Sequence, residues 1–200
     1  MLGFLLTAII IELTPGPNMT WLAVLGATRG RAAALFAVAG VALGLALAGL
    51  VAGLGLTVLF NNYPSLITAL RIAGTLYLFY LAYDAWTDAD GGEAVTEKSN
   101  KAYFTQGFIS NALNPKAYLF YVAILPQFLN VHDRRTQMLA LLTAIYVVVA
   151  TSIHACIALA AGSMAEWLAH SPQAKLLRRC LAVAIGAAAI WFFISTGHFI

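Results

Sequence analysis

The sequence IIIELTPGPNMTW at residues 9–21 decides how this chain folds, because two prolines and a glycine interrupt an otherwise apolar run. Proline removes a backbone N–H donor, and its ring clashes with the carbonyl four residues earlier. Thr14 is a good N-cap and Pro15 a good first-turn residue, so we expect a new helical segment to start there. The sequence therefore predicts an apolar helix that is broken near residues 13–17.

The rest of the chain has the composition of a membrane protein. Of its 200 residues, 62% are hydrophobic and 10% are charged, and the mean hydropathy is +0.85. A soluble domain carries about 25% charged residues. This composition excludes most soluble enzymes, disordered chains and coiled coils.

We expect an all-α membrane protein with six transmembrane helices, since about 20 apolar residues cross a bilayer core as a helix. Residues 61–64 (Asn-Asn-Tyr-Pro) form a turn that divides the longest charge-free run into two spans. Residues 87–103 form the longest loop, which is rich in acidic residues. The six expected helices cover residues 3–27, 33–60, 65–86, 104–128, 135–163 and 174–197.

A second proline motif, Asn114-Pro115-Lys116, lies 100 residues after the first and aligns Pro115 with Pro15. Each proline lies partway along the first helix of a three-helix unit. Three spans in each half make the second half enter the membrane from the opposite face, which is an inverted-topology repeat. We expect a single transmembrane domain over 1–200, with repeats at 1–86 and 104–200 and a cytoplasmic linker at 87–103.

Basic residues predict the orientation, because cytoplasmic loops of membrane proteins are enriched in Lys and Arg. With both termini outside, more of the basic residues lie inside than outside. The inner residues are then Arg29, Arg31, Lys98, Lys101, Lys175, Arg178 and Arg179, and the outer ones are Arg134, Arg135 and Arg71.

The two breaks are the candidate substrate site. Each leaves unpaired carbonyls and free N–H groups, which in lipid cost on the order of several kcal/mol each unless protein or water satisfies them. Both breaks are therefore expected to face a wet cavity. The restarted helices offer partial positive charge to a carboxylate, and Lys116 adds a full charge. The candidate substrate-binding residues are Glu12, Thr14, Pro15, Gly16, Pro17, Asn18, Asn111, Asn114, Pro115 and Lys116.

Alternatives stay open for several of these residues. The prolines can simply kink helices and so shape the bundle. Glu12 can pair with Lys116, bind a substrate ammonium, carry a transported proton, or lie near enough to the interface to be solvated. His154, in the middle of an apolar run, is either a packed hydrogen-bonding residue or a proton relay.

Other kinds of site find no support in the sequence. Cys156 and Cys180 lie in apolar runs without metal-ligand spacing, so we expect neither a metal nor a cofactor. Scattered basic residues argue against nucleic-acid binding, and the absence of catalytic motifs predicts no catalytic residues and no enzyme. Glycines 40, 44, 49 and 53 have the spacing of close helix contacts, either inside the fold or in a homodimer.

These motifs together resemble the LysE/RhtB family of amino-acid exporters. The resemblance rests on TPGPN at 14–18, NALNPKA at 111–117, LPQF at 125–128 and RIAGTLYLFYL at 71–81, and it extends over nearly the whole chain. It implies a multi-pass exporter of amino acids or related metabolites in the bacterial inner membrane, driven by proton antiport, with both termini periplasmic. The pattern of the family carries over to Pro15, Gly16, Pro17, Asn18, Asn111, Asn114, Pro115 and Lys116.

One residue departs from many members of that family, which have Asp after PGP where this chain has Asn18. The change removes one candidate proton carrier and leaves that role to Glu12 or to no side chain in the first helix. The wider superfamily includes metal-ion exporters, but the sequence shows no cluster of metal ligands.

The resulting hypothesis is a secondary transporter in which the substrate lies between the breaks of the first and fourth helices. Its carboxylate contacts the restarted helix ends and Lys116, and its ammonium contacts opened carbonyls, Asn111, Asn114 or Glu12. The repeats rock to expose the site alternately to each side. A non-transporting scaffold, a passive channel and an exporter of another small ion or metabolite are the alternatives.

Overall fold

The computed structural model describes residues 1–53, 62–63, 65–89, 99–129 and 135–196, and within these ranges the chain is helical and contains no strand. The expected all-α class is confirmed. The elements are α1 (Leu2–Leu13), α2 (Pro17–Val51), α4 (Ser65–Ala89), α5 (Asn100–Ala112), α6 (Pro115–Leu119), the π-helical turn η2 (Phe120–Ile124), the 3-10 turn η3 (Leu125–Phe128), α7 (Arg135–Gly162), α8 (Ala165–His170) and α9 (Ala174–Thr196).

Four helical stretches are long and apolar enough to cross a membrane, and α1 is a shorter apolar helix. The count of six spans and the inverted repeat stay predictions. Several expected features fall wholly or partly outside the described residues. They are the turn at 61–64, Arg134, the last residues of two expected helices and most of the 87–103 linker. The four long stretches are Pro17–Val51, Ser65–Ala89, Thr136–His170 and Ala174–Ser195.

The first predicted break is confirmed, although its helix restarts later than expected. Helix α1 ends at Leu13, and α2 begins at Pro17 with Gly16 at its N-cap position. The expectation that Thr14 caps the new helix is wrong. Thr14 instead follows α1, and its hydroxyl donates a hydrogen bond back to the Ile10 carbonyl at 3.0 Å. Either proline suits a first helical turn, and the chain uses Pro17.

The second break is confirmed where the sequence predicts it. Helix α5 ends at Ala112, and α6 starts at Pro115. Asn114 is the N-cap, and its side-chain oxygen accepts a hydrogen bond from the Lys116 backbone N–H at 3.0 Å. The fourth predicted helix is thus a chain of short segments rather than one rod.

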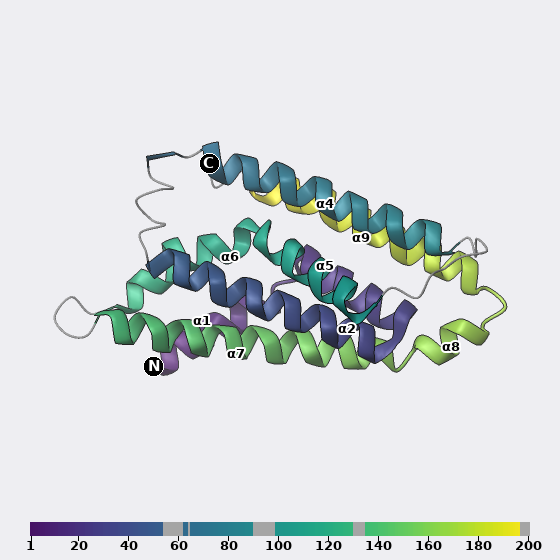
Figure 1. Cartoon of the computed structure of the whole chain (residues 1–200), viewed down its shortest axis with the longest axis horizontal. Helices are drawn as coiled ribbons and strands as arrows, with labels where there is room; N and C mark the ends of the chain where they lie inside the picture. Colours follow the sequence, from purple (N-terminus) through teal and green to yellow (C-terminus); the bar gives the residue numbers. More distant parts are fainter. Residues whose placement is uncertain (54–61, 64, 90–98, 130–134, 197–200) are drawn as a thin grey trace.

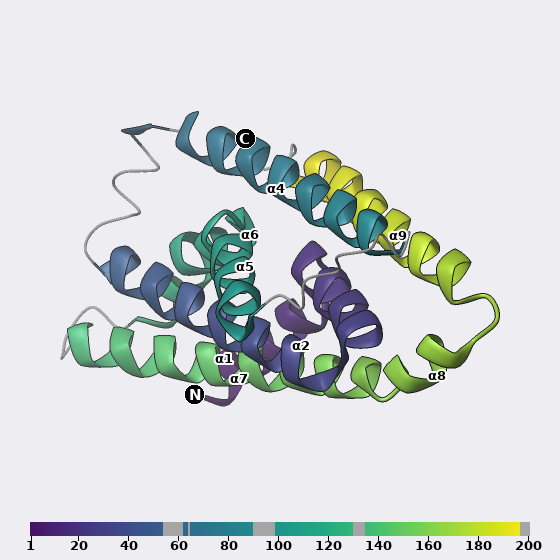
Figure 2. The same cartoon turned by 45° about the vertical axis from the view of Figure 1, so that its right-hand side comes forward.

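Helix α2 is divided by a sharp turn at Gly30, which separates a limb over 17–29 from a limb over 31–51 (Figure 2). Gly30 has φ 85° and ψ 176°, a conformation that is essentially restricted to glycine. This turn lies in the gap that the sequence leaves between its first two expected helices.

Two groups of helices make up the molecule. Helix α2 packs against α5 and α7, while α4 lies along α9 on the opposite side (Figure 1). Small residues allow the closest approach: a Cβ at Gly40 would lie 2.0 Å from the Phe104 carbonyl oxygen. A Cβ at Gly44 would lie 3.0 Å from Asn111. These glycines are therefore used for packing inside the fold.

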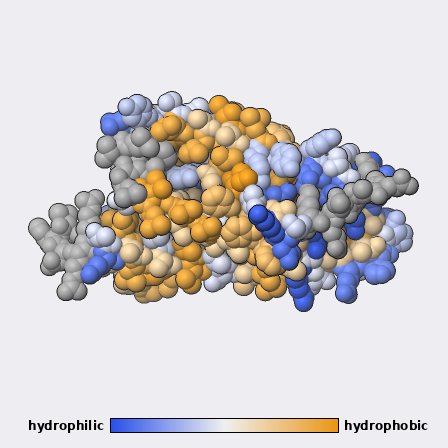
Figure 3. All heavy atoms as spheres, in the orientation of Figure 1, coloured by the Kyte–Doolittle hydropathy of each residue, from blue (hydrophilic) through white to orange (hydrophobic). Residues whose placement is uncertain are grey.

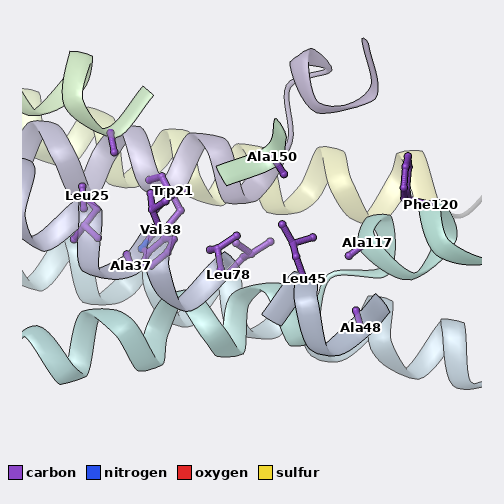
Figure 4. Close-up of a cluster of buried hydrophobic side chains, with 14 of the residues drawn as sticks. Trp21, Leu25, Ala37, Val38, Leu45, Ala48, Leu78, Ala117, Phe120 and Ala150 are labelled. Carbon is purple, nitrogen blue, oxygen red and sulfur yellow. The ribbon is translucent and has the colours of Figure 1, made fainter. Parts of the chain in front are cut away.

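The core follows the second limb of α2. Leu45 and Ala48 lie near Ala117 and Phe120 of the fourth predicted span, while Trp21 and Val38 fill the other end of the same buried cluster (Figure 4). Burying large apolar and aromatic side chains is favourable by roughly 1.5–3 kcal/mol each.

The surface fits a membrane environment. An apolar band covers the middle of the face shown in Figure 3, and hydrophilic side chains gather at the end where α8 lies. Several basic residues of the predicted inner side meet there. Arg29 forms an ion pair with Asp88, and Arg31 packs against Gly162.

Candidate functional site

The two helix breaks lie side by side, although they are about half a chain apart in sequence. The Lys116 ammonium donates a hydrogen bond to the Thr14 carbonyl oxygen at 3.2 Å, and it lies 3.9 Å from the position a Cβ would take at Gly16. A carbonyl freed by the first break is therefore satisfied by the lysine of the second. This contact holds α1 and α6 together at their broken ends.

A narrow cavity of about 20 Å³, which has room for about one water molecule, lies beside this contact. It takes residues from both breaks and from α7. Its lining residues are Glu12, Gly16, Asn18, Met19, Leu45, Asn111, Asn114, Lys116, Ala117, Tyr146 and His154.

The other predicted site residues lie nearby but not on this cavity. Thr14, Pro15 and Pro17 line an adjacent apolar groove between the first break, the fourth predicted span and α9. Pro115 is fully buried and starts α6. The structure therefore brings six of the predicted site residues together at the cavity, while Thr14 and two of the three predicted prolines line the groove.

Amide side chains join the two broken helices across the cavity wall. The Ser110 hydroxyl donates to the Asn18 side-chain oxygen at 2.7 Å, and the Asn18 amide donates to the Asn111 side-chain oxygen at 3.4 Å. The buried amide nitrogen of Asn111 has no protein partner among the described residues. A buried polar group is normally hydrogen-bonded, so this amide is free to bind a ligand or water.

Glu12 lies at the same cavity, and its partners come from α7. The Tyr146 hydroxyl donates to Glu12 Oε1 at 2.6 Å, and His154 Nε2 lies 3.6 Å from Glu12 Oε2. Within the described residues, Lys116 makes no ion pair with Glu12 and contacts the Thr14 carbonyl instead. Glu12 is buried, so the alternative of a solvated residue near the interface is wrong.

Tyr146 is the site residue that the sequence analysis missed. Tyr146 and His154 are eight residues apart on α7, a spacing that places them on similar faces of a helix. Two polar side chains at this spacing inside an apolar span are the sequence feature that could have indicated Tyr146 as a site residue.

The groove beside the cavity is larger and mostly apolar, with a volume of about 410 Å³. Leu119, Phe120, Trp191 and Phe192 form much of its wall, and Lys116 is its charged residue. The two helix breaks therefore lie beside an apolar groove on the surface of the molecule.

The described residues contain no group of three or more His, Cys, Asp or Glu side chains that could hold a metal ion. Cys156 and Cys180 are free and exposed. The expected absence of a metal or cofactor stays a prediction.

Comparison with known proteins identifies relatives along nearly the full chain. An uncharacterized membrane protein of Bacillus subtilis, YrhP, is 27% identical over 98% of both chains. A leucine efflux protein of Klebsiella pneumoniae is 31% identical over 66% of this chain and 65% of its own. A homoserine/homoserine lactone efflux protein of Salmonella typhimurium is 26% identical over 88% of this chain and 87% of its own.

No solved structure matches the chain. The sequence profile of LysE type translocators matches residues 9–196, which include both broken helices and the cavity between them. The protein is thus a multi-pass membrane transporter and not an enzyme. The resemblance inferred from the proline motifs is confirmed, and the chain belongs to the LysE type translocator family.

Proposed function

We propose that this protein exports amino acids or closely related metabolites across the bacterial inner membrane by proton antiport. The relatives named for leucine and for homoserine efflux support an amino-acid substrate. The observation that carries the proposal is the meeting of two broken helices around a cavity that holds Lys116.

The substrate carboxylate binds Lys116 and the helix end that restarts beside Gly16. The ammonium binds carbonyls freed by the breaks and the side chains of Asn111 and Asn114. Broken helices suit such a ligand because their free N–H groups attract anions and their free carbonyls attract cations. The Asn111 amide nitrogen, which has no protein partner among the described residues, is a donor and would bind the substrate carboxylate.

The proposed architecture has two inverted repeats, 1–86 and 104–200, joined by a cytoplasmic linker at 87–103. Both termini lie in the periplasm. The support for this orientation is the gathering of Arg29, Arg31 and Arg178 at one end of the molecule, since basic residues favour the cytoplasmic side.

Substitutions at the two breaks test the site. Pro15→Ala and Asn114→Ala each remove a feature that holds the broken geometry, so we expect at least a tenfold loss of efflux with normal membrane insertion. Efflux is measured from proteoliposomes loaded with radiolabelled L-leucine or L-homoserine. Pro172→Ala and Asn100→Ala, at exposed positions away from the cavity, are the matched controls.

Wild-type efflux by both break variants would refute the site. If the wild-type chain moves none of the amino acids in a panel, the proposed substrate class is wrong. Flux that does not respond to an imposed pH gradient would indicate a passive channel.

A further inference from the structure

Three ionisable side chains form a buried cluster in the cavity wall, and the substrate contacts proposed above do not use them. Glu12 comes from α1, and Tyr146 and His154 come from α7. Their exposed fractions are 4%, 1% and 4%. The Glu12 carboxylate accepts the Tyr146 hydroxyl at 2.6 Å and faces His154 Nε2 at 3.6 Å.

Tyr146 is held in place by aromatic neighbours. Its ring stacks on Phe120 with centroids 3.6 Å apart and an interplanar angle of 10°, and Tyr121 packs edge-on at 5.5 Å. The Tyr121 hydroxyl is itself fixed by donating to the Leu45 carbonyl at 2.9 Å. The hydroxyl that reaches Glu12 is therefore preorganised rather than mobile.

Charged and titratable groups face Glu12 from three elements: Tyr146 and His154 from α7, Lys116 from α6 and Tyr121 from η2. Glu12 is the one acidic residue among the described residues that line the cavity. Asp84 and Asp88 line a different pocket, and Glu166 is on α8. Glu12 is thus the available carboxylate for a proton that passes this site.

Both oxygens of the Glu12 carboxylate face side chains of α7. The ammonium of a substrate therefore has the freed carbonyls and the asparagines as partners, and Glu12 is left for another task. His154 Nδ1 is buried and has no protein partner among the described residues, so the imidazole ring is not fully committed to packing.

We infer that Glu12 binds the proton that is exchanged for substrate, and that Tyr146 and His154 position its carboxyl group. The inference rests on the function proposed above. The proton enters from the periplasm, binds a carboxylate oxygen of Glu12, and leaves towards the cytoplasm when the site faces that side. The ionised carboxylate ties α1 to α7, so the empty transporter changes sides only after Glu12 is protonated. Bound substrate releases this tie, so the loaded transporter changes sides while Glu12 stays ionised.

Glu12→Gln tests this inference, because glutamine imitates the protonated acid and cannot release a proton. In proteoliposomes without a pH gradient, we expect this variant to exchange L-leucine within about threefold of the wild type. With an acidic interior, the wild type accumulates external L-leucine and the variant does not. Glu166→Gln, at an exposed site on α8, is the matched control and should keep both activities.

Two conservative variants test the positioning residues. Tyr146→Phe removes the hydroxyl that donates to the Glu12 carboxylate, so the pH profile of transport should shift. His154→Gln should also shift the pH profile, whereas His170→Gln, on the exposed α8, should leave it unchanged. An unchanged profile in both cluster variants would overturn their assigned roles.

The outcomes separate this inference from the proposed function. If the wild type accumulates L-leucine and Glu12→Gln does so equally, the proton site is wrong and the exporter stands. If folded Glu12→Gln loses exchange as well, Glu12 contacts substrate and the inference is overturned. A wild type that exchanges L-leucine but ignores the gradient would refute proton antiport itself.

Discussion

Lys116 is a charged residue in an apolar segment, and the only hydrogen bond of its ammonium group among the described residues goes to the Thr14 carbonyl. A neutral carbonyl offsets only part of the cost of burying an ammonium. The charge is therefore poised for a stronger partner, which is the role we propose for the substrate carboxylate.

Lys116→Met removes this charge and keeps a side chain of similar length. We expect at least a tenfold loss of amino-acid efflux with normal folding, because burying an apolar chain costs less than burying a charge. Efflux from proteoliposomes and elution in size-exclusion chromatography check the two expectations. Lys101→Met, at an exposed position on α5, should transport normally. Equal loss in both variants would contradict a specific role for Lys116.

The residues of the candidate site differ in how far the sequence alone could place them. The breaks could be located because proline acts on its own helix. Tyr146 could not be assigned to Glu12, because that contact joins residues 134 apart and depends on how α1 packs on α7. Thr14 was misassigned because two neighbouring prolines satisfy the same local rule for a helix start.

At the scale of the elements, α2 and α5 approach so closely that their backbones touch. A Cβ at Gly107 would lie 2.0 Å from the Ala37 carbonyl oxygen, and one at Gly40 would meet Phe104 in the same way. The glycine spacing in the sequence predicted a close contact, but it could not choose between an internal partner and a second copy. Only the packing of α5 on α2 decides that question.

Gly107→Ala tests the contact. The new methyl group would overlap a backbone oxygen that cannot rotate away, so we expect a loss of about 2 kcal/mol or more in the free energy of unfolding. Thermal unfolding in detergent measures the change. Gly186→Ala on α9 is the matched control, because its Cβ would have its nearest neighbour at 3.9 Å. Equal melting temperatures for both variants would contradict the close packing.

At the scale of the whole molecule, the two helix groups mix the two halves of the sequence. Helices α2 and α5 come from different halves, and so do α4 and α9. Rocking of residues 1–86 against 104–200 would have to separate both pairs. We therefore expect α4 and α9 to move against the group around α2, across a boundary that the Arg29–Asp88 ion pair spans.

A reversible cross-link across that boundary should stop transport. Arg29→Cys and Asp88→Cys, introduced together in a Cys156→Ser, Cys180→Ser background, can be joined by a short bifunctional methanethiosulfonate. We expect efflux to fall to background and to recover after reduction with dithiothreitol. The single-cysteine variants treated in the same way are the controls. Unimpaired efflux by the cross-linked protein would place the moving boundary elsewhere.

The glycine contact between α2 and α5 also bears on how the polypeptide is assembled. The helices of each half of the sequence pack mainly against helices of the other half. A covalent connection between the halves therefore adds little to their ability to associate. A gene divided within the segment after α4 and expressed as two fragments would then yield a functional complex in the membrane. In the intact chain, the linker would then serve mainly to ensure that the two halves are made in equal amounts.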